Sequence, residues 1–263
     1  MAKTYRLGSR GEGVRLLQRL LRERGYEVMA DGDFGPKTLA AVKALQQKAG
    51  LTADGIVGAK TMAVLADVTI TQAYISKHIT RKTGRQVRYI AIHYTAGRSS
   101  TAGAAMANRN VFLTRQASAD FVVDDTTIVQ VNPNPDEYYC WAVGDKKNPW
   151  TGGARLNGVA GNVNTVSIEM CSTLRKGTSA ATPNHDGWSF TASELELTRR
   201  LVRYLMLAYD IPRERVVRHY DITGKLCPGV PGWNDGPLYD TGGKALSGRN
   251  SGSEEWETFR GSL

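Results

Sequence analysis

Two eight-residue segments near the N-terminus follow one pattern, and this repeat limits what the first part of the chain can fold into. They read DGDFGPKT from Asp31 to Thr38 and DGIVGAKT from Asp54 to Thr61. In each, Asp-Gly favours a turn because glycine accepts a positive φ. The residues after Lys-Thr, and those before the first turn, space their apolar side chains three or four apart. We therefore expect three short helices joined by Asp-Gly turns, ending near residue 66.

The apolar pattern changes at Val87 from helical spacing to the alternation of β-strands. The segment VRYIAIHYT alternates over its whole length, and later strand-like segments are separated by helical ones. Strands and helices in this order predict an α/β fold with a mixed central β-sheet flanked by helices. The polar segment 67–86 is expected to be a linker with a short element. The expected strands are 87–95, 119–131 (a hairpin turning at Asp124 and Asp125), 163–172 and 215–219, and the expected helices are 100–113 and 191–209.

Two of the four histidines end predicted strands, and one of the three cysteines follows the second of them closely. His93 ends the strand that begins at Val87, and the segment HYDITGKLCPG places Cys227 in the loop after His219. An odd number of cysteines leaves at least one thiol outside any disulfide. Two imidazoles and a thiolate can hold zinc and leave a fourth position for water. We predict a Zn²⁺ site at His93, His219 and Cys227; the alternatives are that Cys227 is an inert buried thiol or that Asp221 supplies an oxygen ligand.

Two families resemble the two parts of the chain. GSRGEGVRLLQRLL and DGDFGPKTLAAVKALQ, within residues 5 to 66, resemble the peptidoglycan-binding domain of cell-wall hydrolases. YIAIHYTAG, SADFVVDD, NTVSIEMC and HYDITGKLCPG resemble the zinc-dependent N-acetylmuramoyl-L-alanine amidases, and SEEWETFRGSL resembles their final short helix. The resemblance implies a peptidoglycan-binding domain at 1–66, a linker at 67–86 and a zinc amidase domain at 87–263.

The second resemblance implies a role for each reactive residue. It assigns zinc binding to His93, His219 and Cys227, and catalytic assistance to Glu169 and Lys225. The bond cleaved would join N-acetylmuramic acid to L-alanine of the stem peptide. Glu169 could instead be a structural carboxylate paired with an arginine, and Lys225 a solvated loop charge. Trp141, Trp150 and Arg155 are candidate substrate contacts. Family members often have histidine where this chain has Asp120 and Ala142.

The net charge of +9 indicates either an anionic partner or a charged surface that keeps the protein soluble. Since no nucleic-acid-binding motif accompanies the basic residues, we expect bacterial peptidoglycan as the partner rather than nucleic acid. The sequence contains no apolar run long enough to span a membrane and no apolar segment typical of a secretory signal. We expect a monomer made in the cytoplasm that reaches the cell wall at phage lysis, as an endolysin does. The alternatives are a bacterial autolysin, a noncatalytic peptidoglycan receptor and a zinc peptidase acting within the stem peptide.

Overall fold

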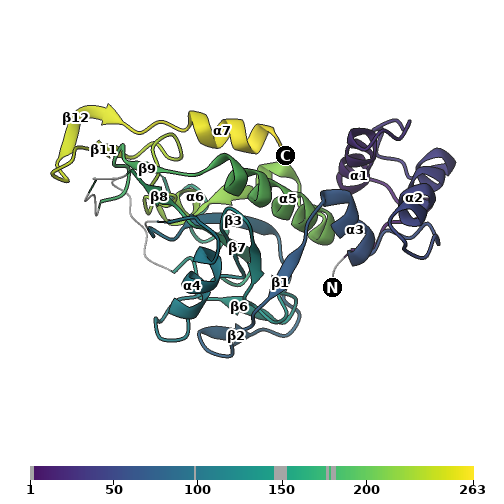
Figure 1. The fold of residues 1–263 in the computed structure, drawn as a ribbon, viewed down its shortest axis with the longest axis horizontal. Helices are drawn as coiled ribbons and strands as arrows, with labels where there is room; N and C mark the ends of the chain where they lie inside the picture. Colours follow the sequence, from purple (N-terminus) through teal and green to yellow (C-terminus); the bar gives the residue numbers. More distant parts are fainter. Residues whose placement is uncertain (1–2, 98, 145–152, 176–177, 179–181) are drawn as a thin grey trace. The chain divides into compact units, whose positions relative to one another are not determined.

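The computed structural model describes residues 3–97, 99–144, 153–175, 178 and 182–263 (Figure 1). The chain divides into two compact units, one of residues up to Thr69 with Arg200–Glu214, and one of Ile70–Arg199 with Arg215–Leu263. The division passes through helix α5 (Ala192–Tyr209). Among the helices of the described residues, none is both long enough and apolar enough to cross a lipid bilayer.

Three helices form the N-terminal module, by which we mean residues 3–66. They are α1 (Glu12–Glu23), α2 (Pro36–Lys48) and α3 (Ala59–Ala66), so the predicted three-helix arrangement is confirmed. Pro36 begins α2, where its missing N–H has no helical partner to lose. Fully buried side chains come from all three helices, from the segment before α1 and from a turn; they include Tyr5, Leu17, Leu21, Phe34, Val42, Met62 and Leu65.

A buried glutamine from the preceding helix anchors each Asp-Gly turn of the repeat. Gln18 of α1 and Gln46 of α2 both donate from the amide nitrogen to the turn aspartate and to a carbonyl two residues later, and both accept the glycine N–H. The repeated pattern therefore includes a helical glutamine as well as the eight turn residues. The bonds are Gln18 to Asp31 Oδ1 (2.8 Å), Asp33 O (2.9 Å) and Gly32 N (2.8 Å), and Gln46 to Asp54 Oδ1 (3.0 Å), Ile56 O (3.0 Å) and Gly55 N (2.9 Å).

A six-stranded mixed sheet forms the centre of the second unit and confirms the predicted α/β fold. Its strand order is β1-β5-β4-β7-β3-β10, and every neighbouring pair is parallel except the β4–β5 hairpin. The hairpin turns at Asp124 and Asp125, as expected. The strands are β1 (Ile70–Gln72), β3 (Tyr89–Tyr94), β4 (Phe121–Val123), β5 (Ile128–Gln130), β7 (Thr165–Met170) and β10 (Val216–Arg218).

Strand β1 and the short strand β2 (Ile79–Arg81) lie within the segment 67–86, which the sequence presents as a linker. β1 is an edge strand of the central sheet, and β2 pairs with β6 (Tyr138–Cys140). The domain boundaries at 66 and 86 stay a prediction.

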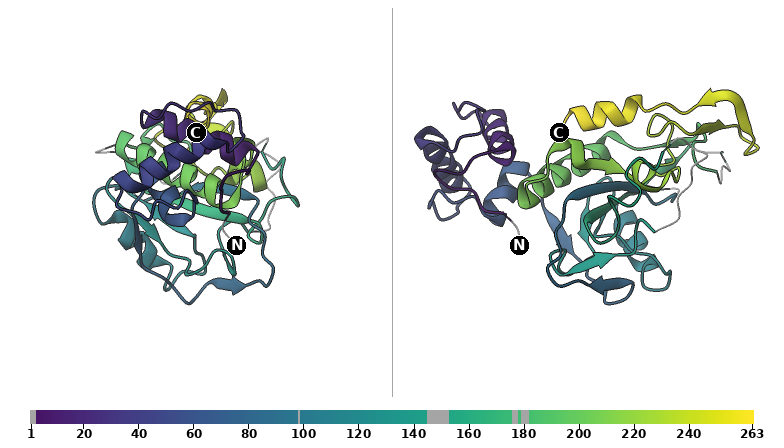
Figure 2. Two further views of the ribbon diagram at one scale, coloured as in Figure 1. Left: turned by 90° about the vertical axis from the view of Figure 1, so that its right-hand side faces the viewer. Right: turned by 180° about the vertical axis from the view of Figure 1, so that it is seen from behind.

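Helices and small hairpins surround the sheet. α4 (Ala104–Val111) contributes Ala105 to an apolar cluster with Val122 and Val129 of the β4–β5 hairpin. The C-terminal segment, yellow in Figures 1 and 2, consists of the β11–β12 hairpin followed by helix α7. The remaining elements are β8 (Thr173–Leu174), β9 (Trp188–Ser189), the 3-10 helix η2 (Arg213–Arg215), α6 (His219–Thr223), β11 (Pro237–Tyr239), β12 (Ala245–Asn250) and α7 (Glu254–Gly261).

The last expected strand, which ends at His219, is one residue too long at its C-terminal end. Strand β10 ends at Arg218, and His219 begins helix α6. The cause is Asp221, whose carboxylate accepts both the backbone N–H of Arg218 (2.8 Å) and its guanidinium Nη2 (2.8 Å). An acidic side chain in the first turn that binds the N-cap N–H stabilises a helix start. Gly224 then ends α6 with a φ of 78°, in the left-handed region that glycine favours.

Candidate metal centre and catalytic cavity

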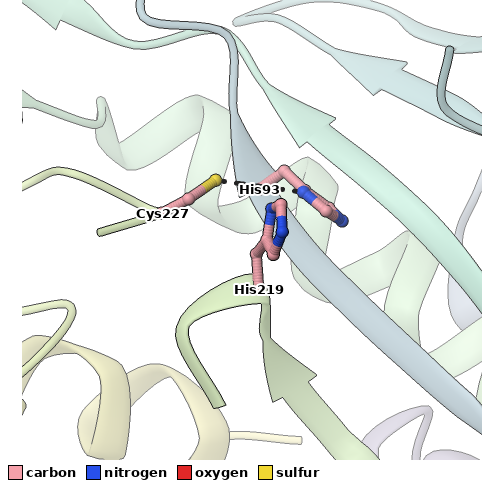
Figure 3. A group of neighbouring side chains, drawn as sticks. All are labelled: His93, His219 and Cys227. Atoms are coloured by element: carbon pink, nitrogen blue, oxygen red, sulfur yellow. Dashed lines mark hydrogen bonds between the residues drawn. The ribbon is translucent and has the colours of Figure 1, made fainter. Parts of the chain in front are cut away.

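Three segments that are distant in the sequence bring His93, His219 and Cys227 together. Strand β10 pairs with β3 so that Arg218 lies opposite Ile92. The residue that follows each of these two is a histidine, His219 after Arg218 and His93 after Ile92. The loop after α6 carries Cys227 back toward them, as Figure 3 shows. One ligand atom from each residue lies within 4.8 Å of the other two, and all three side chains are buried.

The geometry and bonding of these atoms fit a tetrahedral zinc ion. Cys227 Sγ lies 3.9 Å from His93 Nδ1, close to the roughly 3.6 Å that tetrahedral Zn–S and Zn–N bonds would impose. The Nε2 atom of His219 bonds the carbonyl oxygen of Val143 at 2.7 Å. Within the described structure, His219 Nδ1 and His93 Nε2 are buried and have no hydrogen-bond partner. A carbonyl that holds one imidazole nitrogen and leaves the other free is the usual support of a metal-binding histidine.

The local environment keeps both histidines neutral, which is the form that binds metals. Burial lowers the pKa of His93 well below its usual value, and the charges of His219 and Lys225 lower it further. Burial also lowers the pKa of His219 to about 4, with Lys225 acting in the same direction. Burial and then Glu169 raise the pKa of Cys227 to about 12, so this thiol needs a cation to ionise. The donor set therefore fits a divalent metal that accepts nitrogen and sulfur ligands.

Glu169 lies beside His93 on the neighbouring strand of the sheet. The parallel pairing of β3 and β7 makes these two residues partners in register. The Glu169 residue is half-buried, but its Oε2 atom is buried and has no hydrogen-bond partner among the described residues. Burial raises the pKa of Glu169 to about 7, against the opposing charges of Lys225 and Arg115. No ion pair within 4.0 Å joins Glu169 to an arginine in the described part of the chain, but the charge of Arg115 acts on Glu169, so the structural alternative stays open.

A cavity of about 1000 Å³ opens beside these residues. Glu169 and His219 line it, and so does Lys225, whose side chain is exposed to the cavity. Lys225 shifts the pKa of all three proposed metal ligands and of Glu169, which places its charge near the centre of the site. Arg115 lines the same cavity and was not expected from the sequence, because no local pattern distinguishes it in its polar loop.

The three predicted substrate contacts lie in different surroundings. Trp141 lines the cavity with a half-exposed ring, and its Nε1–H donates to Thr80 Oγ1 at 2.9 Å. Arg155 instead forms an ion pair with Asp221 at 3.3 Å and is absent from the described cavity lining. Trp150 lies outside the described residues. The carboxylate of Asp221 binds the guanidinium groups of Arg218 and Arg155. These bonds suit a residue that orients the site rather than one that binds the metal.

The two positions where the family often has histidine also have definite places. Asp120 is fully buried in the sheet, where it accepts the Ser167 N–H (2.7 Å) and an amide hydrogen of Asn132 (2.6 Å). Ala142 lines the cavity, and its N–H donates to Asn162 Oδ1 (3.1 Å). Asp120 therefore stabilises the sheet through these hydrogen bonds. Because residue 142 is alanine, its position in the cavity wall carries no imidazole.

Comparisons with known proteins match both parts of the chain to known families. Residues 83–230, more than half of the chain, match the family described as N-acetylmuramoyl-L-alanine amidase, and residues 10–65 match the putative peptidoglycan binding domain. The chain is 31% identical over 141 residues to the N-acetylmuramoyl-L-alanine amidase CwlH of Bacillus subtilis, covering 53% of this chain and 46% of that protein. It is 49% identical over 59 residues to the zinc D-Ala-D-Ala carboxypeptidase of Streptomyces albus G, covering 20% and 22%.

The chain spans less than half the length of each of these curated relatives. Among solved structures, a mutant endolysin from Bacillus subtilis is similar at a TM-score of 0.48 and 23% identity, covering 74% of this chain and 98% of that one.

Proposed function

We propose that this chain, which belongs to the N-acetylmuramoyl-L-alanine amidase family, hydrolyses the amide bond between N-acetylmuramic acid and L-alanine of the peptidoglycan stem peptide. One observation supports this proposal above the others. Donor atoms of His93, His219 and Cys227 lie within 4.8 Å of one another beside a cavity that Glu169 and Lys225 also line. This combination suits metal-assisted amide hydrolysis.

His93, His219 and Cys227 would hold zinc as the cofactor. When bound, zinc supplies Lewis-acid chemistry and lowers the pKa of a water to about 7. The carbonyl of Val143 orients the His219 ring for binding. The buried surroundings of the three ligands strengthen electrostatic interactions within the site.

Glu169 and Lys225 would perform the proton transfer and the charge stabilisation. A carboxylate whose pKa lies near 7 can accept a proton from the attacking water and pass it to the leaving amine. The Lys225 ammonium would stabilise the negative charge that develops on the former carbonyl oxygen. Loss of such a donor typically costs about 10²- to 10³-fold in rate.

The N-terminal module would bind the same polymer. Residues 10–65 match a peptidoglycan-binding family, and the positive net charge suits the acidic groups of the cell wall. The proposed role as a phage or prophage endolysin rests on the sequence resemblance. A bacterial autolysin would use the same chemistry.

The test is mass spectrometry of the products released from purified peptidoglycan by the zinc-loaded full-length protein. We expect new amino groups on L-alanine, and loss of about 10²- to 10⁴-fold in rate for Glu169→Gln. Glu137→Gln is the matched control, because Glu137 forms a surface ion pair with Arg81 away from the cavity lining. New amino groups inside the stem peptide would indicate a peptidase instead. Binding without any cleavage would indicate a receptor and refute the proposal.

A further inference from the structure

We propose that Asn184 and Asn234 are positioning residues for Cys227, and that this pair sets the affinity of the site for its metal. The inference rests on the proposed function only in taking Cys227 as a metal ligand. Asn234 follows Cys227 by seven residues, Asn184 lies far before it in the sequence, and neither belongs to the three proposed metal ligands. Their effect would be exerted through the backbone that follows the cysteine.

The two asparagine side chains bind each other inside the protein. Asn184 Nδ2 donates to Asn234 Oδ1, and Asn234 Nδ2 donates to Asn184 Oδ1, both at 2.7 Å. Both residues are fully buried. A buried amide is costly unless it is hydrogen-bonded, and a reciprocal pair fixes the plane of each amide relative to the other. The pair is therefore a rigid link between two loops that are 50 residues apart in sequence.

This link holds the two residues that follow Cys227. Asn234 Nδ2 donates to the carbonyl oxygen of Pro228 at 2.7 Å, and the backbone N–H of Asn184 donates to the carbonyl oxygen of Gly229 at 2.5 Å. The carbonyl oxygen of Cys227 itself accepts the N–H of Tyr220, in helix α6, at 2.9 Å. Three consecutive carbonyl groups are thus held by three different partners, which fixes the direction in which Cys227 presents its sulfur.

Close packing around the pair leaves little room for the loop to move. A side chain at Gly229 would collide with the hydroxyl of Tyr94 and lie 2.6 Å from Cβ of Pro183. Gly236, whose N–H donates to Asn234 Oδ1 at 2.9 Å, has no room for a side chain because Leu226 occupies that space. The asparagine pair therefore sits in a closely packed contact between the cysteine loop and its two neighbours.

Metal affinity is sensitive to such an arrangement, because a thiolate that is displaced by a fraction of an ångström no longer fits a tetrahedral site. Loss of outer groups that orient metal ligands typically costs about 10- to 100-fold in metal affinity. The asparagine pair is such an outer group for Cys227, as the Val143 carbonyl is for His219.

The test compares zinc affinity of the full-length protein with that of Asn234→Asp, measured by competition with a chromogenic chelator. This change keeps the shape of the side chain but removes the donor to Pro228 and places a carboxylate against Asn184 Oδ1. We expect zinc binding to weaken about 10- to 100-fold. We also expect weaker or shifted sulfur-to-cobalt charge-transfer absorption when Co²⁺ replaces zinc, since that band reports the cysteine–metal bond directly.

The matched control is Asn132→Asp. Asn132 is also fully buried and donates to a carboxylate, Asp120 (2.6 Å), and to a carbonyl, Tyr138 (2.8 Å), and neither partner belongs to the cysteine loop. We expect this variant to lose stability and to retain zinc affinity and the cobalt spectrum. A second variant, Asn234→Ser, removes the amide without adding charge and should weaken zinc binding in the same way.

Unchanged zinc affinity and cobalt absorption in folded Asn234→Asp would overturn the inference. Failure of both Asn234 variants to fold with saturating zinc would also overturn it, since the pair would then serve the whole fold. The proposed function fails separately: a wild-type protein that binds zinc through Cys227 but cleaves no peptidoglycan would refute the function and leave the positioning role intact.

Discussion

Removal of the Gln46 side chain tests whether the glutamine anchors hold the N-terminal module together. The Gln46 amide is buried; its two N–H groups serve Asp54 and the carbonyl of Ile56, and its oxygen accepts the Gly55 N–H. Gln46→Ala removes these three hydrogen bonds, each contributing a net stabilisation of about 1 kcal/mol. We expect the free energy of unfolding of the module to fall by about 3 kcal/mol.

A decrease of about 3 kcal/mol in the free energy of unfolding is large for a module of this size. With an m value of about 1 kcal/mol per molar urea, the unfolding midpoint of the module should fall by roughly 3 M. Far-UV circular dichroism of the full-length protein would follow the loss of helix. All five tryptophans lie after residue 140, so their fluorescence would report whether the rest of the chain stays folded.

The neighbouring Gln47→Ala is the matched control, because Gln47 lies in the same helix and is exposed. Its free energy of unfolding should stay within about 0.5 kcal/mol of wild type. Gln18→Ala should cost as much as Gln46→Ala, since the two turns are bound alike. A Gln46→Ala protein as stable as the control would refute the anchoring argument.

Two other predictions concern burial and metal. Burial raises the pKa of Glu194 to about 9 from its usual 4.5, with the charge of Asp125 acting in the same direction; the contribution of Glu194 to stability is therefore greatest below pH 4.5 and is lost as pH rises toward 9. Glu194→Gln should remove a slope on the order of 1 kcal/mol per pH unit and raise stability at pH 8, and parallel pH profiles of urea unfolding for both proteins would contradict this. Removal of zinc by a chelator should lower the thermal midpoint of the wild-type protein by the equivalent of about 4 kcal/mol when free zinc had been about 1,000 times Kd. His93→Ala should show no such change, and an equal decrease in that variant would exclude His93 as a ligand.

Local patterns predicted most of the fold because the chain follows them closely. The alternation at 87–95 became β3, and the Asp-Gly turns became the connections between α1, α2 and α3. Thr191 and Glu194 have the spacing of a capping box at the start of α5, and Thr191 Oγ1 accepts the Glu194 N–H at 3.2 Å. Both carboxylate oxygens of Glu194 are buried and make no hydrogen bond of regular geometry among the described residues, and the backbone N–H groups of Thr191 and Cys171 act on them only weakly. Burial of that side chain depends on tertiary packing, which the four-residue pattern does not encode.

The candidate metal ligands could be predicted from the sequence because their residue types and spacing are those of a metal site. The positions of His93, His219 and Cys227 suggested a metal site, and the structure brings their donor atoms together. The support around them was not predictable, because it consists of backbone carbonyls and distant amides. Val143 has no polar side chain, and nothing in the sequence connects Asn184 with Asn234.

The register between β3 and β7 constrains how this site can change. Because His93 and Glu169 are partners on one rung of a parallel ladder, their spacing is fixed by main-chain hydrogen bonds rather than by side-chain packing. Substitutions in the cavity wall can alter which substrates enter without disturbing that spacing. A one-residue insertion or deletion within β7 would turn Glu169 to the opposite face of the sheet. The strand should therefore tolerate many changes of residue type and almost no change of length.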